Sequence, residues 1–498
     1  MSVALPTTIM TMARRGFCFG LVCIAWLVSV DAQAGKSEPS KSTERRPNII
    51  FILADDLGYG DVGCYGQKQI KTPQLDQMAA DGLRFTQAYA GAPVCAPSRC
   101  VLMTGLHQGH ARVRGNVEAM SLPATLLADD VTVATVLKDA GYKTALIGKW
   151  GLGEPQKNAQ GLPNRHGFDY FYGYLKQGHA HNYYPDYLWR NESKVKLPNV
   201  ISDDPALRHN VSSKRVEYSH DLFAQETLKF VREHKDQPFF LDLSLTIPHA
   251  NDEAGDKGME VPSLGEYEKK DWPEPQKGYA AMVTRMDADI GRLFALLKEL
   301  KIDDNTLVIF TSDNGPHQEG GFNPRFFDSN GPLRGFKGNV TDGGIREPMI
   351  ARWPGHVPAG KTTDAPVYFA DMMPTFAKLT GAKAPSGIDG VDISPTLDGK
   401  DQPALSERFM YWEFDRDGVV AQSARYGKWK ADREPKTSKI ELYDLSNDAG
   451  ESHNVADEHA DILAKFTEYF RTARKDSPTW PMVVKTKPGA KSGGASAE

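Results

Sequence analysis

The chain has 498 residues, of which 40% are hydrophobic and 25% are charged, and its formal net charge at pH 7 is -5. This balance excludes a chain that is disordered throughout, and the length suffices for one large domain and a smaller one. Because the chain lacks a basic surplus, we exclude the nucleic-acid-binding class and expect no nucleic-acid partner.

The N-terminus has the layout of a secretory signal peptide. Arg14 and Arg15 precede an apolar run over residues 16–30, and Ala32-Gln33-Ala34 follows as a cleavage site. The run is shorter than the roughly 20 apolar residues that a spanning helix requires, so we expect no stable membrane span. We predict a signal peptide over residues 1–34 and an exported protein, periplasmic or secreted. The two arginines are compatible with either a Sec or a twin-arginine route.

A continuous apolar run over residues 48–54 ends in Asp55-Asp56 and predicts a strand buried on both faces, with acids at its carboxyl end. Further buried strands are predicted over residues 144–147, 239–245, 307–311 and 348–352. Helical spacing of apolar residues predicts helices over residues 131–140 and 279–300. This alternation predicts an α/β fold, a large and mostly parallel mixed sheet sandwiched by helices, with ligands at the carboxyl ends of the strands.

The pattern changes after residue 396. Short segments such as residues 409–412, 427–430 and 442–445 predict a small antiparallel sheet, and residues 460–473 predict a helix that packs against it. We therefore expect a catalytic domain over residues 47–396 and a C-terminal subdomain over residues 397–484. A disordered linker over residues 35–46 and a flexible tail over residues 485–498 complete the predicted organisation.

The most specific stretch of the chain is Cys95-Ala96-Pro97-Ser98-Arg99, followed by Thr104-Gly105. Each fixed residue has a chance of about one in twenty of occurring at a given position, so a chance match to the whole stretch is rare. The stretch resembles the C-x-P-S-R signature of the type I, formylglycine-dependent sulfatase family in the alkaline-phosphatase-like superfamily. The similarity runs from about residue 47 to residue 456, and its variant motifs look like those of bacterial arylsulfatases and N-acetylgalactosamine-6-sulfatases.

The resemblance implies that a formylglycine-generating maturation enzyme oxidises Cys95 and that the hydrate of the resulting aldehyde is the nucleophile. The chemistry favours this group over the thiol. A thiolate attacking sulfur would leave a thiosulfate-like ester with no easy exit, whereas a sulfated geminal diol expels sulfate when its second hydroxyl collapses to the aldehyde. Arg99, one helical turn later, is expected to hold the hydrate and the oxygens that face the metal through its planar fork.

Two acidic clusters match the metal site of the family. Asp55 and Asp56 follow the first strand, and Asp313 and Asn314 follow a later one. Hard oxygen ligands of this kind suit Ca²⁺, with Mg²⁺ as the runner-up, and they do not suit Zn²⁺. With the group derived from Cys95, these four residues are the predicted metal ligands, and the ion would offset the negative charge of the sulfate.

Three cationic or titratable residues match further catalytic positions of the family. They are Lys149 in a Gly-Lys-Trp-Gly-Leu-Gly stretch, His249 after Ile-Pro, and Lys337 before a glycine. The resemblance implies that they bind sulfate oxygens and the bridging oxygen as the S–O bond breaks. His249 is the predicted general acid for the leaving alcohol, with Lys337 beside it.

One position departs from the family pattern. Many sulfatases have a histidine where this chain has Gly151, so a contact to the hydrate or the sulfate is missing. His179 and His181, on a neighbouring loop, are the predicted substrate-binding residues that replace it.

The sequence thus predicts a sulfuric ester hydrolase that acts on a sulfated carbohydrate or an aryl sulfate. Two alternatives stay open at this point. The first is a phosphoester or phosphonate hydrolase on the same scaffold, and the second is a non-catalytic glycan-binding relative in which Cys95 is never converted.

Overall fold

The central strand of the fold, β1 (Asn48–Asp55), is buried along its whole length. A computed structural model describes residues 46–116, 125–155, 159–207, 209–416, 419–433, 437 and 439–482. The predicted signal peptide, the tail over 485–498 and all of the predicted linker except Arg46 lie outside these residues, so those predictions stay predictions. The described residues all belong to one compact unit.

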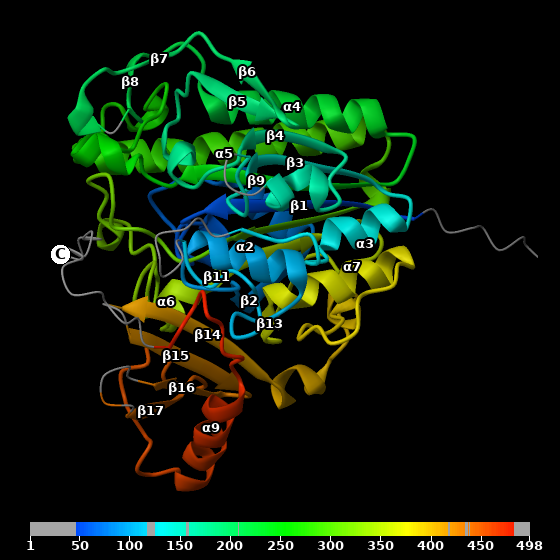
Figure 1. Cartoon of the computed structure of the whole chain (residues 1–498), viewed down its shortest axis with the longest axis vertical. Coiled ribbons are helices and arrows are strands. Elements are labelled where there is room, and N and C mark those ends of the chain that lie inside the picture. The colour runs from blue at the N-terminus through cyan, green and yellow to red at the C-terminus, as the bar shows by residue number, and fades with distance from the viewer. Residues whose placement is uncertain are drawn as a thin grey trace, which may run out of the picture. The chain divides into compact units, whose positions relative to one another are not determined.

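The large sheet has eleven strands (Figure 1). In spatial order they are β12 (Lys361–Thr363), β2 (Leu83–Tyr89), β11 (Arg346–Arg352), β10 (Thr306–Ser312), β1, β9 (Phe239–Pro248), β3 (Lys143–Lys149), β4 (Tyr170–Tyr174), β5 (Tyr187–Arg190) and β6 (Ser193–Lys196), with β13 (Val367–Tyr368) paired to β2. The central strands β10, β1, β9, β3 and β4 are mutually parallel. The strands toward both edges include antiparallel pairs, so the sheet is mixed.

Alternate residues of β1 face the two sides of the sheet, and helices cover both (Figure 1). Ile49, Phe51 and Leu53 belong to a core shared with α2 (Cys95–Thr104), α3 (Val133–Asp139) and α7 (Met372–Thr380). Ile50, Ile52 and Ala54 belong to a core shared with α1 (Pro73–Ala80), α4 (Ser219–His234) and α5 (Glu274–Glu299). This arrangement confirms the predicted α/β class. Within the described parts of the chain, no helix combines the length and the apolar character needed to cross a bilayer.

The predicted strands are all present, with small extensions. The run over 348–352 is part of β11, which lies antiparallel to β10. A buried apolar run has the same pattern in either direction, because helices cover both faces of the sheet. The direction follows from the connection, which contains a 3-10 turn (Pro324–Phe326) and the short helix α6 (Asp342–Ile345) but no long crossover helix. Other short elements include α8 (Ser394–Leu397) and the two-stranded ribbon of β7 (Val200–Ile201) and β8 (Ser212–Lys214).

A separate antiparallel sheet follows, as predicted for the C-terminal region. Its strands are β14 (Phe409–Arg416), β15 (Val419–Tyr426), β16 (Trp429–Arg433) and β17 (Ile440–Asp444). The helix α9 (Ala460–Thr472) packs on one face of this sheet through Phe466 and Phe470. The helix therefore lies where its sequence period predicts, whereas the boundary at residue 396 stays a prediction.

A buried lysine joins this second sheet to the loop before α6. Lys430, in β16, is fully buried and donates to the carbonyl of Val340 at 2.9 Å. Its ammonium also pairs with Glu451 and lies 3.3 Å from Asp342. Glu451 in turn accepts the backbone N–H of Asp342 at 2.7 Å. Asp432, on the same strand, also lies 3.7 Å from this ammonium. Three acidic side chains and one ammonium therefore lock the start of α6 against β16, a few residues from Lys337.

Candidate active site

Four neighbouring parallel strands deliver most of the site. Asp55 is the last residue of β1 and Lys149 the last of β3, while His249 directly follows β9 and Asp313 directly follows β10. Because the carboxyl ends of parallel strands meet at one edge of a sheet, these side chains converge. The chain turns sharply there, since Asp56 has a left-handed φ of 66°, which an aspartate tolerates better than a branched residue.

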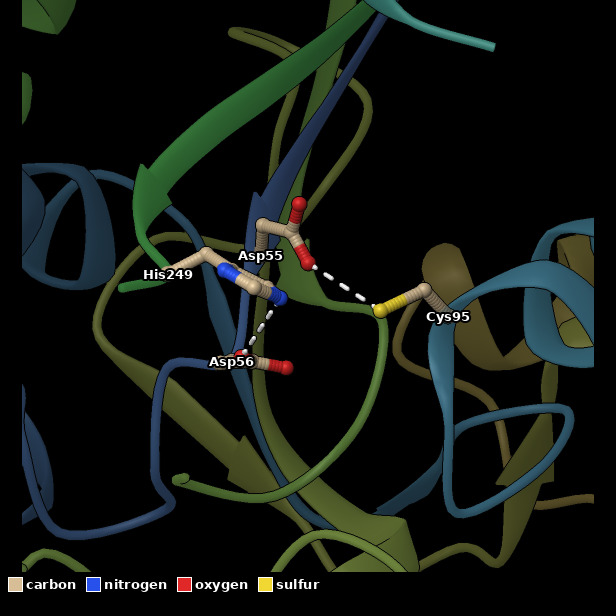
Figure 2. Close-up of side chains that lie close together, drawn as sticks. All are labelled: Asp55, Asp56, Cys95 and His249. Atoms are coloured by element: carbon tan, nitrogen blue, oxygen red, sulfur yellow. Dashed lines mark hydrogen bonds and ion pairs between the residues drawn. The ribbon is translucent and has the colours of Figure 1, made fainter. Parts of the chain in front are cut away.

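The helix α2 brings Cys95 to the same place. Cys95 is the first residue of α2, its preceding residue Val94 is extended, and its side chain is 1% exposed. Its Sγ lies 3.4 Å from Oδ1 of Asp55. Figure 2 shows Cys95, Asp55, Asp56 and His249 pointing toward one another from α2, the end of β1 and the end of β9. Burial raises the pKa of Cys95 well above its usual value, so the unmodified group is a thiol and a poor nucleophile.

Arg99 connects α2 to the carboxyl ends of β10 and β3. Its Nε and Nη2 both donate to Oδ2 of Asp313, at 3.0 and 2.7 Å, and its Nη1 donates to the carbonyl of Lys149 at 2.8 Å. Nη2 also lies 3.6 Å from Oδ2 of Asp55. The fork of Arg99 therefore fixes the carboxylates, which is the positioning part of its predicted role.

The carboxylates differ in charge state. Burial alone would raise the pKa of Asp55, but the Lys149 ammonium, 2.7 Å from its Oδ2, holds that pKa well below its usual range. Burial, and then the negative charge of Asp55, raise the pKa of Asp313 to about 7. A cation bound beside Asp313 would stabilise its ionised form and lower this pKa.

The oxygen donors fit a hard cation. Asn314 donates from Nδ2 to Oδ1 of Asp56 at 2.7 Å, but its buried Oδ1 has no hydrogen-bond partner among the described residues. Ligand atoms of Asp55, Asp56, Cys95 and His249 all lie within 4.8 Å of one another. The structure thus brings the four predicted ligands Asp55, Asp56, Asp313 and Asn314 together, and the orphaned amide oxygen is the kind of group that a bound Ca²⁺ or Mg²⁺ satisfies.

His249 and Lys337 form a pair beside Asp56. Nζ of Lys337 lies 3.0 Å from Oδ2 of Asp56 and 3.2 Å from Nε2 of His249. Nδ1 of His249 is 2.6 Å from the carbonyl of Ala250, so Nδ1 carries the proton and Nε2 accepts from Lys337. Burial, with the Lys337 charge next, lowers the pKa of His249 well below its usual value. The pair therefore keeps its transferable proton on Lys337.

Glu319 is a site residue that no sequence pattern indicates. Its Oε2 lies 2.7 Å from Nζ of Lys337. Burial alone would raise the pKa of Glu319, but the Lys337 ammonium lowers it to about 2. A charged Glu319 therefore pairs with the same ammonium that lies 3.0 Å from Asp56. The only sequence signal is its place in the loop that follows Asp313, which is too general to identify a role.

The two loop histidines have different surroundings. The ring of His181 stacks on that of His249 at 4.7 Å between centroids, and its Nδ1 lies 3.2 Å from Glu253. The ring of His179 packs between Tyr174 and Tyr187, at 5.0 and 4.5 Å. His181 therefore lies one ring away from the cluster, and its predicted contact with substrate stays a prediction, as does that of His179. Neither histidine is among the nearest neighbours of Gly151.

The described cysteines Cys64, Cys95 and Cys100 are all free thiols. Cys95 and Cys100, five positions apart, are therefore not a disulfide. Because the sulfur of Cys95 is not part of a disulfide, it is available for oxidation to another group.

Comparisons with known proteins agree on one family. The Sulfatase family model matches residues 47–382, and the model for the C-terminal region of N-sulphoglucosamine sulphohydrolase matches residues 336–476. Human arylsulfatase A is 33% identical over 450 residues, which cover 82% of this chain and 83% of the relative. Human N-acetylgalactosamine-6-sulfatase is 33% identical over 374 residues, which cover 70% of this chain and 66% of the relative.

Solved structures agree on the fold. The crystal structure of Ps i-CgsB in complex with k-i-k-neocarrahexaose is 32% identical, has a TM-score of 0.73 and covers 88% of this chain and 95% of its own. A phosphonate monoester hydrolase of Agrobacterium radiobacter is 21% identical with a TM-score of 0.60, covers 86% of this chain and 95% of its own, and shares the fold alone. The chain therefore belongs to the type I sulfatase family of the alkaline-phosphatase-like superfamily and is an enzyme that hydrolyses sulfate esters.

Proposed function

We propose that the enzyme uses a formylglycine made from Cys95 and a bound Ca²⁺ to remove sulfate from a sulfated carbohydrate or an aryl sulfate. The observation that carries this proposal is the position of Cys95, whose Sγ is buried against Asp55 within the oxygen-rich cluster. The raised pKa of the Cys95 thiol argues against direct attack by sulfur. A formylglycine hydrate at this position supplies a hydroxyl nucleophile and later releases sulfate by regenerating the aldehyde.

Asp55, Asp56, Asp313 and Asn314 would hold the ion, which when bound offsets the negative charge of sulfate oxygens. Lys149, 2.7 Å from Asp55, keeps that carboxylate ionised, and Arg99 orients the carboxyl group of Asp313. Lys337 and His249 lie beside Asp56, 3.0 and 3.5 Å from its Oδ2. From there they would together deliver a proton to the leaving oxygen, so that the departing group leaves as a neutral alcohol.

The proposed substrate is a sugar sulfate or an aryl sulfate, and the proposed location is outside the cytoplasm. Support for a sugar comes from relatives whose names include N-acetylgalactosamine-6-sulfatase, and from the neighbour solved with k-i-k-neocarrahexaose. Support for export to the periplasm or medium comes from the signal-peptide pattern of residues 1–34. A maturation enzyme that generates formylglycine is the proposed partner, because Cys95 cannot act in its unmodified form.

Mass spectrometry of the peptide that contains Cys95, prepared from native protein, tests the proposal. We expect an aldehyde in place of the thiol, detected by its mass and by reaction with a hydrazide. The peptide around Cys64 serves as the control and should keep its thiol. Native, active protein with an unmodified Cys95 would contradict the formylglycine proposal, and an inactive one would favour the glycan-binding alternative. Hydrolysis of phosphate monoesters faster than sulfate esters would favour the phosphatase alternative.

Replacing Asn314 by alanine is expected to weaken Ca²⁺ binding by at least about tenfold, because one oxygen ligand is lost while every carboxylate remains. Titration of Ca²⁺ into protein freed of metal by a chelator, followed by calorimetry, measures the change. Asn447→Ala, at an exposed turn of the C-terminal region, is the matched control and should bind Ca²⁺ as the wild type does. An unchanged Ca²⁺ affinity in Asn314→Ala would remove Asn314 from the ligand set.

A further inference from the structure

Gly151 has no room for a side chain of its own. Its φ is +73°, a left-handed conformation that favours glycine. A Cβ at this position would overlap Nε2 of Gln177 and would lie 2.8 Å from Cδ and 3.5 Å from Oε1 of the same residue. These three atoms are the nearest to that Cβ, so the amide of Gln177 takes the place in which a side chain at position 151 would begin.

The backbone brings Gln177 to this place. Beyond the paired strands β3 and β4, Trp150 N–H donates to the carbonyl of Tyr174 at 2.9 Å, and Gly151 N–H donates to that of Leu175 at 3.2 Å. Gln177 follows two residues later and immediately precedes a short 3-10 turn, Gly178–His181. Because the ladder continues past the sheet, the approach of Gln177 to Gly151 is fixed by main-chain hydrogen bonds.

The segment that carries Gln177 connects two catalytic residues. At one end, Gly151 lies two residues after Lys149, whose Nζ is 2.7 Å from Asp55. At the other end, His181 stacks on His249. The residues from Leu175 to His181 therefore run from a hydrogen bond with Gly151, two residues after Lys149, to the ring of His249.

The amide of Gln177 has an unused donor. Nε2 is buried and has no hydrogen-bond partner among the described residues. A buried N–H₂ group without an acceptor is unfavourable, and in proteins such groups are satisfied by a ligand or by ordered water. A sulfate ester presents three acceptor oxygens, and an amide donor can bind one of them without adding a charge.

We propose that Gln177 is a substrate-binding residue whose amide N–H donates to an oxygen of the sulfate group, from the position that a side chain at residue 151 would otherwise occupy. Gly151 and Gln177 then form a matched pair, in which the glycine leaves space for the glutamine. This inference rests on the function proposed above, because it requires a sulfate ester seated at Cys95.

Gln177→Glu tests the donor directly, since it keeps the size of the side chain but replaces the N–H₂ group with a negatively charged acceptor. We expect kcat/KM for a sulfate ester to fall by at least about tenfold, and the affinity for inorganic sulfate, measured by calorimetry, to fall in parallel. Ca²⁺ affinity and the melting temperature should stay near wild type. Gln77→Glu, on the exposed face of α1, is the matched control.

A double variant tests the shared position. Gln177→Ala should lose activity, and adding Gly151→Asn should restore part of it, because asparagine tolerates a positive φ and places an amide in the vacated space. A double variant no more active than Gln177→Ala would contradict the proposal, as would a folded Gln177→Glu protein with unchanged kcat/KM and sulfate affinity. If the wild-type protein contains formylglycine, either result overturns this inference alone. If the wild-type protein lacks formylglycine, the proposed function is overturned as well.

Discussion

Cys95→Ala is expected to reduce sulfate release by at least about four orders of magnitude, because the variant cannot form any nucleophile at this position. The side chain is small, and its removal leaves the carboxylates, Lys149 and Arg99 paired with one another. We therefore expect the variant to fold and still to bind Ca²⁺ through Asp55, Asp56, Asp313 and Asn314, with its affinity lowered by about tenfold because the ligand at position 95 is lost. Release of inorganic sulfate, with calorimetry for Ca²⁺, measures both effects.

Cys100→Ala is the matched control for this loss. Cys100 lies on the same helix and is equally buried, but it belongs to the hydrophobic core on the far side of α2 from the carboxylates. Burial raises the pKa of Cys100 to about 12, as expected for an inert structural thiol. Substantial activity in Cys95→Ala, or an equal loss in Cys100→Ala, would show that the chemistry does not depend on the sulfur at position 95.

His249→Ala is expected to lower kcat/KM for a sugar sulfate by about 10²–10⁴, the usual contribution of general acid catalysis, because the proton held on Lys337 would lose the imidazole that helps to deliver it. A sugar alkoxide is a poor leaving group and needs a proton as the S–O bond breaks, whereas a nitrophenolate does not. The loss should therefore be much smaller with 4-nitrophenyl sulfate. Steady-state kinetics of one variant with both substrates separates proton delivery from simple damage to the pocket.

An equal loss with the two substrates would contradict this role, because a general binding or folding defect would affect both alike. His453→Ala, an exposed residue of the C-terminal region, should leave both rates unchanged. Lys337 holds a hydrogen bond to His249 in the structure. For that reason the variant should retain some protonation by the ammonium, and its pH–rate profile should shift toward that of a lysine acid.

The elements that could be predicted are those whose structure is determined by residues close together in the sequence. A buried run such as residues 49–54 must be covered on both faces, and its strand could be predicted because no other element suits six consecutive apolar residues that end in two acids. The strand β2 escaped prediction, since Leu83–Tyr89 mixes arginine, threonine and glutamine with its apolar residues. These polar side chains are tolerated because β2 lies near the sheet edge, a position that depends on pairing far along the chain.

The candidate site shows the same division. The motif around Cys95, the acid pair after β1 and the pair after β10 are each made of neighbouring residues. The residue types and spacing within each group are therefore enough to predict a role in the site. Glu319 and Gln177 act through contacts with residues far from them along the chain. The sequence reveals that a histidine is absent at Gly151, but only the path of β4 and the following loop shows that a glutamine occupies the space.

The buried charges around Lys430 bear on how such enzymes can be recombined. An ammonium without its carboxylates, or the reverse, is strongly unfavourable in a dry interior, so Lys430 and the carboxylates of Asp342, Asp432 and Glu451 must be inherited or exchanged together. A chimaera that joins this catalytic core, which contains Asp342, to the terminal sheet of another sulfatase would misplace the loop of Lys337 unless the incoming region supplied counterparts of the other three. The catalytic core and the C-terminal sheet are therefore distinct in structure, but neither can be exchanged without these buried charges.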